Sequence, residues 1–584
     1  MPSIYFDLMS MRDELVPDGY VYWAERWAYR VSGLKLVTGG MGDNLKWMLV
    51  GDLLAKGGES ALVEDVITSG DLEGLYRAGG QFWLVILNRR PGVMEIIRDR
   101  TGVMPLSYAQ HNNRIAFSTS VGRVIESLQL ARGVELQMLN TWPLYRKTFA
   151  PVTPYSEVES LSGEHTISVE RDTIQAVANP LGPRHAAVFS NIHETLEGID
   201  AALKGATRKR LSEECRYGVL LSGGTDSSLV VAMIREYYKE QLNTLFVTFS
   251  DYSRDYGRYA AVVANTYGTN HDTLRINAQD YARAWPHTIK TLQTPVPMPC
   301  HVGFSLAMRH LAGSVDVLID GDGADTVFGS PVWPQLALLS ALGSVLPSEV
   351  RNFLLRSSSR SFYGSKLGTI LKLALQAGGT PLRLYPHTAA AMLDERAFDS
   401  VFAAGHWREG MLFRSSFAEG PFLDGIFTYL FLHGISEDIV TAVRIAYEEG
   451  IRFTYPFLDH HVLNTSLRIP NRIRWHLWTR KFPLKRYALK YFDREFVFKP
   501  KEGFGVPLGR WFATKEFEHL LALPLEHRSL RRGWWHEGPL RAVITEHQKG
   551  MGSDQTAERV PWIAANLELW ARICLDGDRP EQYT

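Results

Sequence analysis

The chain has 584 residues, 45% of them hydrophobic, so it is long enough to bury sizeable cores in two or three domains. Lysine plus arginine and aspartate plus glutamate both number 63, so no overall field favours nucleic acid or an acidic membrane as a partner. The three cysteines, Cys215, Cys300 and Cys574, are too few and too scattered for a disulfide framework or a zinc site. Since the first residues lack a signal-peptide pattern and no long apolar run occurs, we expect a soluble cytoplasmic protein.

The first part of the chain predicts a sheet-rich domain. Short alternating or β-branched runs, such as "GLKLVTGG", "GQFWLVILNRR" and "HTISVERDTIQAV", are separated by glycine, asparagine and aspartate. The segment "ANPLGPRHAAVFSN" contains two prolines and a glycine, and the helix-period segment "IHETLEGIDAALKGATRKRL" follows it. We therefore expect one domain over 1–185 and a second over 186–584.

In the second domain, predicted strands and helices alternate. "YGVLLSGG" indicates a buried strand and a tight turn, and "TDSSLVVAMIREYYKEQ" indicates the helix after it. "TLFVTFS" and "VDVLIDGDG" indicate two more buried strands, each followed by helical sequence. This alternation predicts a doubly wound α/β domain with a mainly parallel sheet.

The turn after the first of these strands, "SGGTDSS", has the composition of a phosphate-binding loop. Ligands of an open parallel sheet bind beyond the carboxyl ends of its strands, where the amides of the next helix attract anions. Gly223 and Gly224 allow close backbone approach, and Asp226 can hold a cation that binds phosphate. Four hydroxyl groups can donate hydrogen bonds, from Ser222, Thr225, Ser227 and Ser228. An ordinary capped turn is the alternative, and no Walker-type Gly-Lys-Ser/Thr follows.

Several segments together resemble one family. "SGGTDSS" resembles the pyrophosphate loop of enzymes that split ATP between its α and β phosphates to adenylate a carbonyl oxygen. Three later segments resemble signatures of the asparagine synthetase family: "DGDGADTVFG", "YPFLDHHVLN" and "KPKEGFGVPLGRW". In the first of them, Thr326 stands where the family usually has Glu. Residues 80–109 resemble the amide-hydrolysing N-terminal domain of class B members, which implies an α+β glutaminase-like (Ntn-type) sandwich before the synthetase domain.

The resemblance implies ATP and Mg²⁺ as cofactors and gives roles to individual residues. Asp226 and Asp325 would coordinate Mg²⁺, which bridges the ATP phosphates. Lys501 would stabilise charge on the phosphate and on the oxyanion that forms when an amine attacks the acyl-adenylate. Asp322 would touch the substrate or relay a proton, with a simple turn role as the alternative. The AMP pocket would be lined by Leu220, Ser250 and Gly321.

Two departures from the family pattern bear on the reaction. Residue 2 is proline, where glutamine-dependent members have the cysteine nucleophile, and no Asn-Gly-Glu segment occurs in the first 80 residues. We therefore expect an N-terminal domain without glutaminase activity. Before "YPFLD", where the family has Gly-x-Glu-x-Arg, this chain has Arg452 and Thr454. Glu448 and Glu449 lie nearby, but spacing alone does not make either a substitute.

Loss of the nucleophile is shared by β-lactam synthetases, carbapenam synthetases and lasso peptide cyclases, whose amine comes from the substrate itself. β-Lactam formers use a Tyr and Glu pair where this chain has Asp322 and Arg452, which disfavours a β-lactam product. The leading expectation is therefore a lasso peptide cyclase that acts on a precursor core peptide. Its pathway partners would be a leader peptidase and a leader-binding protein, with no nucleic acid and no membrane.

Other functions stay open. One is an ammonia-dependent asparagine synthetase or other small-molecule amide ligase, and another is a non-catalytic relative that binds a partner protein. The 15 tryptophans suit a groove for a peptide and a large core equally well.

Overall fold

The computed structural model describes residues 3–11, 20–55, 58–148, 150–161, 163, 165–178, 188–251, 257–329, 338, 345–347, 349–350, 400–403, 436–476, 478–500, 505–553 and 559–584. Among these residues, no helix combines the length and the apolar character needed to cross a bilayer.

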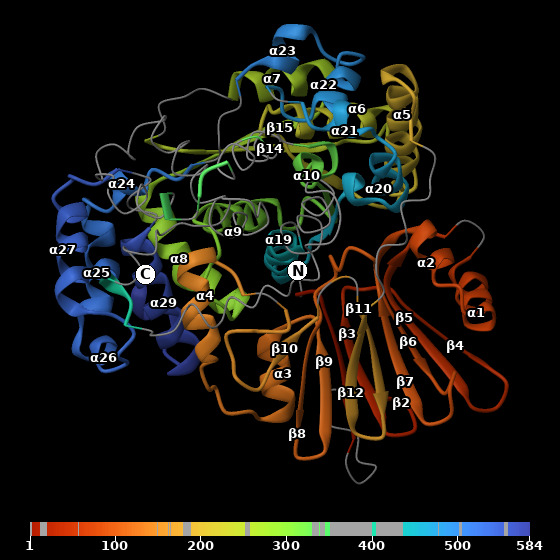
Figure 1. The fold of residues 1–584 in the computed structure, drawn as a ribbon, viewed down its shortest axis with the longest axis horizontal. Coiled ribbons are helices and arrows are strands. Elements are labelled where there is room, and N and C mark those ends of the chain that lie inside the picture. Colours follow the sequence, from red (N-terminus) through yellow and green to blue (C-terminus); the bar gives the residue numbers. More distant parts are fainter. Residues whose placement is uncertain are drawn as a thin grey trace.

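The N-terminal region folds into two stacked antiparallel sheets of six strands (Figure 1). One sheet has the order β10 (Glu159–Ser160), β8 (Ser107–His111), β9 (Arg114–Ser118), β1 (Tyr5–Ser10), β3 (Trp27–Ser32), β2 (Val21–Ala24). The other has the order β12 (Thr173–Ala178), β11 (His165–Glu170), β7 (Val93–Arg98), β6 (Gly80–Leu87), β5 (Leu45–Leu53), β4 (Leu36–Met41). Four helices accompany them: α1 (Glu59–Ser69), α2 (Glu73–Ala78), α3 (Val121–Leu128) and α4 (Leu136–Tyr145).

Strand β6 is buried on both of its faces, one against the other sheet and one against helix α1. Trp83 and Val85 belong to the core between the two sheets, and the alternating residues Leu84 and Ile86 belong to a second core that includes Val63 of α1. Side chains of a strand point alternately to its two faces, so a strand buried on both sides has a continuous apolar sequence. The predicted glutaminase-like sandwich is confirmed.

The second region contains a five-stranded parallel sheet in the order β15 (Asn270–Ile276), β14 (Asn243–Phe249), β13 (Tyr217–Leu220), β16 (Val317–Ile319), β17 (Arg452–Thr454). The chain runs outward from β13 to β15 and then returns to β16 on the other side of β13. The order therefore reverses between β13 and β16, and such a reversal opens a crevice at the carboxyl ends of these strands. The predicted doubly wound α/β domain is confirmed.

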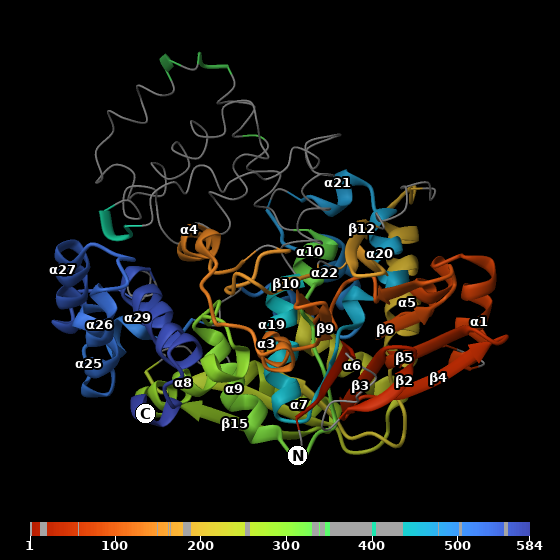
Figure 2. The same ribbon diagram turned by 90° about the horizontal axis from the view of Figure 1, so that it is seen from below.

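Helices lie around this sheet, and the C-terminal helices form a further layer beside them. Around the sheet lie α5 (Ile192–Arg208), α6 (Thr225–Tyr237), α7 (Gly257–Tyr267), α8 (Ala278–Leu292), α9 (Cys300–Leu311), α10 (Ala324–Phe328), α19 (Ser436–Glu448), α20 (His460–Leu467), α21 (Asn471–Arg474), α22 (Phe482–Ala488) and α23 (Arg494–Phe498). The C-terminal layer, blue in Figures 1 and 2, holds α24 (Leu508–Trp511), α25 (Lys515–Ala522), α26 (His527–Leu530), α27 (Glu537–Gln548) and α29 (Val560–Trp570). Short helical turns lie at Pro456–Leu458, Leu523–Leu525, Ala571–Leu575 and Pro580–Tyr583.

Tryptophans hold the C-terminal layer to the rest of the domain. The rings of Trp285 in α8 and Trp562 in α29 are stacked, with centroids 5.7 Å apart and an angle of 7° between their planes. Among the described residues, seven tryptophans are fully buried: Trp47, Trp83, Trp142, Trp285, Trp511, Trp562 and Trp570. Much of the aromatic content therefore builds cores, and it gives no argument for a peptide groove.

A buried ion cluster joins the two regions. The carboxylate of Asp459, which is 1% exposed, lies 2.7 Å from both Lys209 Nζ and Arg210 Nη1. The same Lys209 ammonium donates a hydrogen bond to the backbone carbonyl of Ala78 in α2, 2.8 Å away. The end of α2 is thus connected through Lys209 to the segment that follows β17.

Candidate active site

The loop between β13 and α6 has the form of an anion site. Gly223 has φ 72°, a left-handed conformation that favours glycine, and it lets the chain turn from the strand into the helix. The N-cap residue of α6, Gly224, has no side chain that could satisfy the first amides of the helix. Such amides, together with the helix dipole, bind phosphate oxygens. Ser222 is exposed, and its hydroxyl lies 3.1 Å from that of Ser227.

A lysine that the sequence analysis did not single out lies in the centre of this site. Lys481, at the start of α22, places its ammonium 2.5 Å from Oδ2 of Asp226 and 3.3 Å from Oδ2 of Asp325. Its side chain is only 4% exposed. Burial by itself would lower the pKa of Lys481, but the two carboxylates outweigh that effect and raise the pKa above its ordinary value. The lysine is therefore a fixed positive charge between two aspartates.

The backbone of Lys481 is also unusual. Its φ is 50°, in the left-handed region that few residues other than glycine adopt, and its amide donates to the carbonyl of Gly329, 2.8 Å away. Strained conformations of this kind persist where the surroundings fix a side chain for a function. No motif marks this lysine in the sequence, because its partners lie on distant segments.

Asp226 and Asp325, the two residues predicted to bind Mg²⁺, lie close together. They come from the first turns of α6 and α10, which follow β13 and β16, and both contact the ammonium of Lys481. Oδ1 of Asp226 is buried and accepts no hydrogen bond from any described residue, so it has capacity for a cation. In the described part of the chain no three His, Cys, Asp or Glu side chains form a metal site. One or two carboxylates suffice for Mg²⁺, since it keeps waters and phosphate oxygens as its other ligands.

The residues predicted to line an AMP pocket lie at the ends of neighbouring strands. Leu220 is the last residue of β13, Ser250 follows β14, and Gly321 follows β16 by two positions. A Cβ at Gly321 would stand 3.0 Å from the backbone carbon of Asp226 and 3.1 Å from its Cβ. Only glycine fits there without displacing the loop that carries Asp226.

Two further aspartates lie at the end of β16. Asp322 is exposed, and its amide donates to Oδ1 of Asp320, 2.8 Å away. Burial and the neighbouring charge of Asp322 raise the pKa of Asp320 well above its ordinary value. The predicted substrate residue Asp322 thus lies in a group of carboxyls at the crevice.

Arg452 and Thr454, which depart from the family pattern, both contact distant segments of the chain. Arg452 lies 3.1 Å from Asp52 of β5, and its other terminal nitrogen lies 3.2 Å from Sγ of Cys215. The hydroxyl of Thr454 accepts a hydrogen bond from Arg210 Nε, 3.1 Å away. Arg452 therefore joins the parallel sheet to the N-terminal region.

Glu448 and Glu449 lie before β17, at the end of the strand opposite to the crevice. Glu449 forms an ion pair with Arg309 at 3.3 Å. Burial and the neighbouring Glu449 raise the pKa of Glu448. Their position does not support either residue as a substitute for a glutamate in the crevice.

Lys501 lies outside the described residues, but the lysine two positions before it is described. Lys499 has its ammonium 3.4 Å from the ring centroid of Phe496, and burial and Lys485 lower its pKa to about 8. The hydroxyl of Thr225 in the phosphate loop approaches the carbonyl of Val497 at 3.5 Å. The segment that leads to Lys501 thus starts beside the loop.

Comparison with known proteins agrees with this geometry. A family model described as asparagine synthase matches residues 198–572, and one described as a glutamine amidotransferase domain matches residues 59–179. The glutamine-hydrolyzing asparagine synthetase 1 of Bacillus subtilis (strain 168) is 20% identical over 510 residues, which cover 85% of this chain and 78% of that protein. The glutamine-hydrolyzing asparagine synthetase of Cricetulus griseus is 34% identical over 159 residues, 24% of this chain and 28% of that protein.

Proposed function

The chain belongs to the asparagine synthase family, which makes it an ATP-dependent carbon–nitrogen ligase, and we propose that its reaction is the closure of a macrolactam. The observation that carries the proposal is the cluster of Lys481, Asp226 and Asp325 in a chain of this family whose N-terminal region, 1–185, contains no cysteine. An amide ligase without a cysteine to release ammonia from glutamine needs another amine, and the substrate itself can supply it.

The proposed reaction has two steps. A carboxylate oxygen of an Asp or Glu side chain in the peptide attacks the α-phosphorus of ATP, the bond from that phosphorus to the bridging oxygen breaks, and pyrophosphate leaves. The N-terminal amine of the peptide then attacks the acyl carbon and releases a proton to solvent, and the bond from that carbon to the phosphate oxygen breaks, so that AMP leaves. The products are a macrolactam, AMP and pyrophosphate.

The chain's own residues serve mainly the first step. The amides at the start of α6 and the hydroxyls of the loop bind phosphate oxygens, and Lys481 offsets the charge that accumulates on the departing pyrophosphate. Asp226 and Asp325 would hold Mg²⁺, whose charge would further neutralise the phosphates when it is bound. Lys501 would stabilise the oxyanion of the second step.

The substrate proposed is a precursor peptide with a free N-terminal amine and an Asp or Glu several residues along. A leader peptidase and a leader-binding protein of the same pathway would prepare it. A small-molecule amide ligase that uses ammonium is the alternative, because it would need the same ATP residues.

The test uses the purified chain, Mg²⁺, ATP and synthetic peptides that carry a free N-terminal amine and an Asp or Glu several residues along. We expect release of AMP and pyrophosphate and a peptide product lighter by one water. Release of ADP and phosphate would contradict the reaction type. Formation of asparagine from free aspartate and ammonium at a comparable rate would instead establish the small-molecule ligase.

A further inference from the structure

The turn that follows β14 is held from two sides. On one side, the amide and the hydroxyl of Ser250 both donate to the carbonyl of Ile276 in β15, at 2.9 and 3.2 Å. On the other side, helix α24 contacts Asp251: Trp511 Nε1 donates to its Oδ2 at 2.6 Å, and Arg510 Nη1 donates to its backbone carbonyl at 2.9 Å. We refer to these two contacts with α24 as the Asp251 clamp. The peptide unit that joins Ser250 to Asp251 is therefore fixed at both of its ends.

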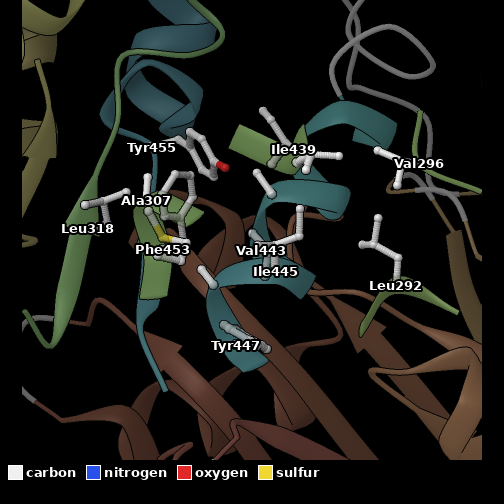
Figure 3. Close-up of a cluster of buried hydrophobic side chains, with 14 of the residues drawn as sticks. Leu292, Val296, Ala307, Leu318, Ile439, Val443, Ile445, Tyr447, Phe453 and Tyr455 are labelled. Atoms are coloured by element: carbon white, nitrogen blue, oxygen red, sulfur yellow. The ribbon is translucent and has the colours of Figure 1, made fainter. Parts of the chain in front are cut away.

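The tryptophan of the Asp251 clamp has a rigid setting. Trp511 is 1% exposed, and the centroid of its ring lies 5.7 Å from that of Phe249, the last residue of β14, and 5.5 Å from that of Tyr281 in α8. Helix α8 is itself fixed in the core, since Figure 3 shows its last residue, Leu292, in one buried cluster with Val443 of α19. A donor held by packing in this way keeps its direction without a ligand, which is the condition for a preorganised site.

The residues that the Asp251 clamp holds are themselves accessible. Ser250 and Asp251 are exposed, whereas Ile276 and Trp511, which hold them, are buried. An exposed carboxylate can bond to water instead, so its contact with Trp511 adds little to the stability of the fold. The turn also lies at the carboxyl edge of the parallel sheet, where ligands of such sheets bind. A role in ligand binding therefore explains the contact better than a role in the core.

The segment 497–511 reaches this edge of the sheet at two places. At its start, the hydroxyl of Thr225 in the phosphate loop approaches the carbonyl of Val497 at 3.5 Å. At its end, Arg510 and Trp511 make the Asp251 clamp. The first contact is on the phosphate side of the crevice, and the second is beside Ser250, one of the residues predicted to line the AMP pocket.

We propose that Trp511 and Arg510 are positioning residues, which through Asp251 fix the turn after β14 in the form that binds the nucleoside end of ATP. A turn that had to be ordered when the nucleotide arrives would lose conformational entropy at that moment, and this loss would weaken binding. The Asp251 clamp orders the turn beforehand. The inference rests on the proposed function for the identity of the nucleotide, but binding alone tests it.

The first experiment compares two ligands that occupy different ends of the nucleotide site. Calorimetric titration of the purified chain with AMP measures the nucleoside end, and titration with inorganic pyrophosphate and Mg²⁺ measures the phosphate loop. Trp511→Phe keeps an aromatic ring but removes the N–H group. It should weaken AMP binding about tenfold, which is about 1.4 kcal/mol, and leave pyrophosphate binding unchanged. Equal losses for the two ligands, or no loss for AMP, would overturn the proposal.

The matched control is Trp535→Phe in the same C-terminal layer. Trp535 is 5% exposed, and its Nε1 also donates a hydrogen bond, to the carbonyl of Pro524 at 2.8 Å. Both tryptophan variants therefore lose one indole hydrogen bond, and their unfolding temperatures should fall by similar amounts. Trp535→Phe should bind AMP like the wild type. A tenfold loss in this control would reduce the effect at Trp511 to general destabilisation and overturn the proposal.

The second experiment is a double-mutant cycle between the two ends of the carboxylate contact. Asp251→Ala and Trp511→Phe remove the same hydrogen bond, so the double variant should bind AMP no more weakly than Asp251→Ala alone. Asp251→Asn keeps an acceptor oxygen and should retain most of the affinity that Asp251→Ala loses. Losses that add up in the double variant would mean that the two residues act independently, which would overturn the clamp.

Arg510→Ala keeps the proposal testable if Trp511→Phe does not fold, because Arg510 is exposed. It should weaken AMP binding in the same direction and leave pyrophosphate binding unchanged. Wild-type affinity for AMP in both Arg510→Ala and Asp251→Ala would overturn the proposal.

The clamp and the proposed reaction fail in different ways. A chain whose AMP affinity depends on Trp511, but which releases no pyrophosphate with any peptide, would keep the clamp and refute the macrolactam reaction. Macrolactam formation together with an unchanged AMP affinity in Trp511→Phe would keep the reaction and refute the clamp.

Discussion

The ammonium of Lys481 lies 2.5 Å from Oδ2 of Asp226, although 255 positions separate the two residues in the chain. The contact joins the phosphate loop after β13 to the start of α22. Asp325, which follows β16, contacts the same ammonium. Three segments therefore meet at one buried positive charge, at the carboxyl ends of the central strands.

We predict that Lys481→Met lowers pyrophosphate release about 100-fold or more, the scale known for loss of one preorganised group that stabilises developing negative charge. Methionine keeps the length and apolar contacts of the side chain but removes its charge. The measurement is the steady-state rate of pyrophosphate formation. Lys490→Met is the control, because Lys490 forms a half-exposed pair with Asp200 and should keep the wild-type rate. A wild-type rate in Lys481→Met would exclude the lysine from phosphate chemistry.

Asp226→Asn and Asp325→Asn should each abolish Mg²⁺-dependent AMP formation. Asparagine keeps the size of the side chain but lacks the charge that holds a divalent cation, and an unneutralised triphosphate is a poor leaving group. AMP is measured over a Mg²⁺ titration, with Asp200→Asn as a surface control. Unchanged turnover in either variant would remove that aspartate from the metal site.

The phosphate loop could be predicted from the sequence because its glycines, hydroxyls and aspartate are contiguous and follow a buried strand. Lys481 could not be predicted in this way, since neither of its two aspartate partners is within a hundred residues of it in the chain. The pairing of β16 with β17 also depends on a register between strands more than a hundred residues apart. Sequence order reveals strands and turns, but it does not reveal which strand ends become neighbours.

Glutamine should be neither hydrolysed nor required. The N-terminal sandwich keeps its two sheets, but residues 1–185 contain no cysteine that could attack the glutamine amide. The assay is glutamate release from glutamine by the purified chain in the presence of ATP and peptide. Glutamate release in step with product formation would show that another residue of this region acts as the nucleophile.

Asp459→Asn should destabilise the protein by about 3–5 kcal/mol, the cost of leaving buried cations without their partner. Burial would raise the pKa of Asp459, but Arg210 and Lys209 outweigh it and lower the pKa. The stabilisation is therefore fully present above the ordinary carboxyl pKa and is lost as pH falls through the lowered one. Urea unfolding at pH 7 and in acid measures this, and the difference between variant and wild type should shrink in acid.

The control for that prediction is Asp172→Asn. Asp172 pairs with Arg26 at 2.6 Å, but both side chains are well exposed, at 47% and 38%. Exposed ion pairs contribute about 0–1 kcal/mol to the free energy of unfolding, so this variant should be nearly as stable as the wild type. If the two substitutions had equal effects, the buried cluster between the two regions would have no special role in stability.

Lys501 separates activation from ring closure. If it stabilises the oxyanion that forms when the amine attacks, Lys501→Ala should lose product formation by about 100-fold or more. Pyrophosphate exchange into ATP should decline less, because adenylation precedes the amine attack. Acetylation of the peptide amine should act in the same direction, blocking closure while it permits activation.

Lys499→Ala is the control for a lysine at another position of the same segment, since the ammonium of Lys499 lies over the ring of Phe496. Full activity of Lys501→Ala would refute the role that the motif assigns to it, and equal losses in exchange and closure would place the lysine in the first step.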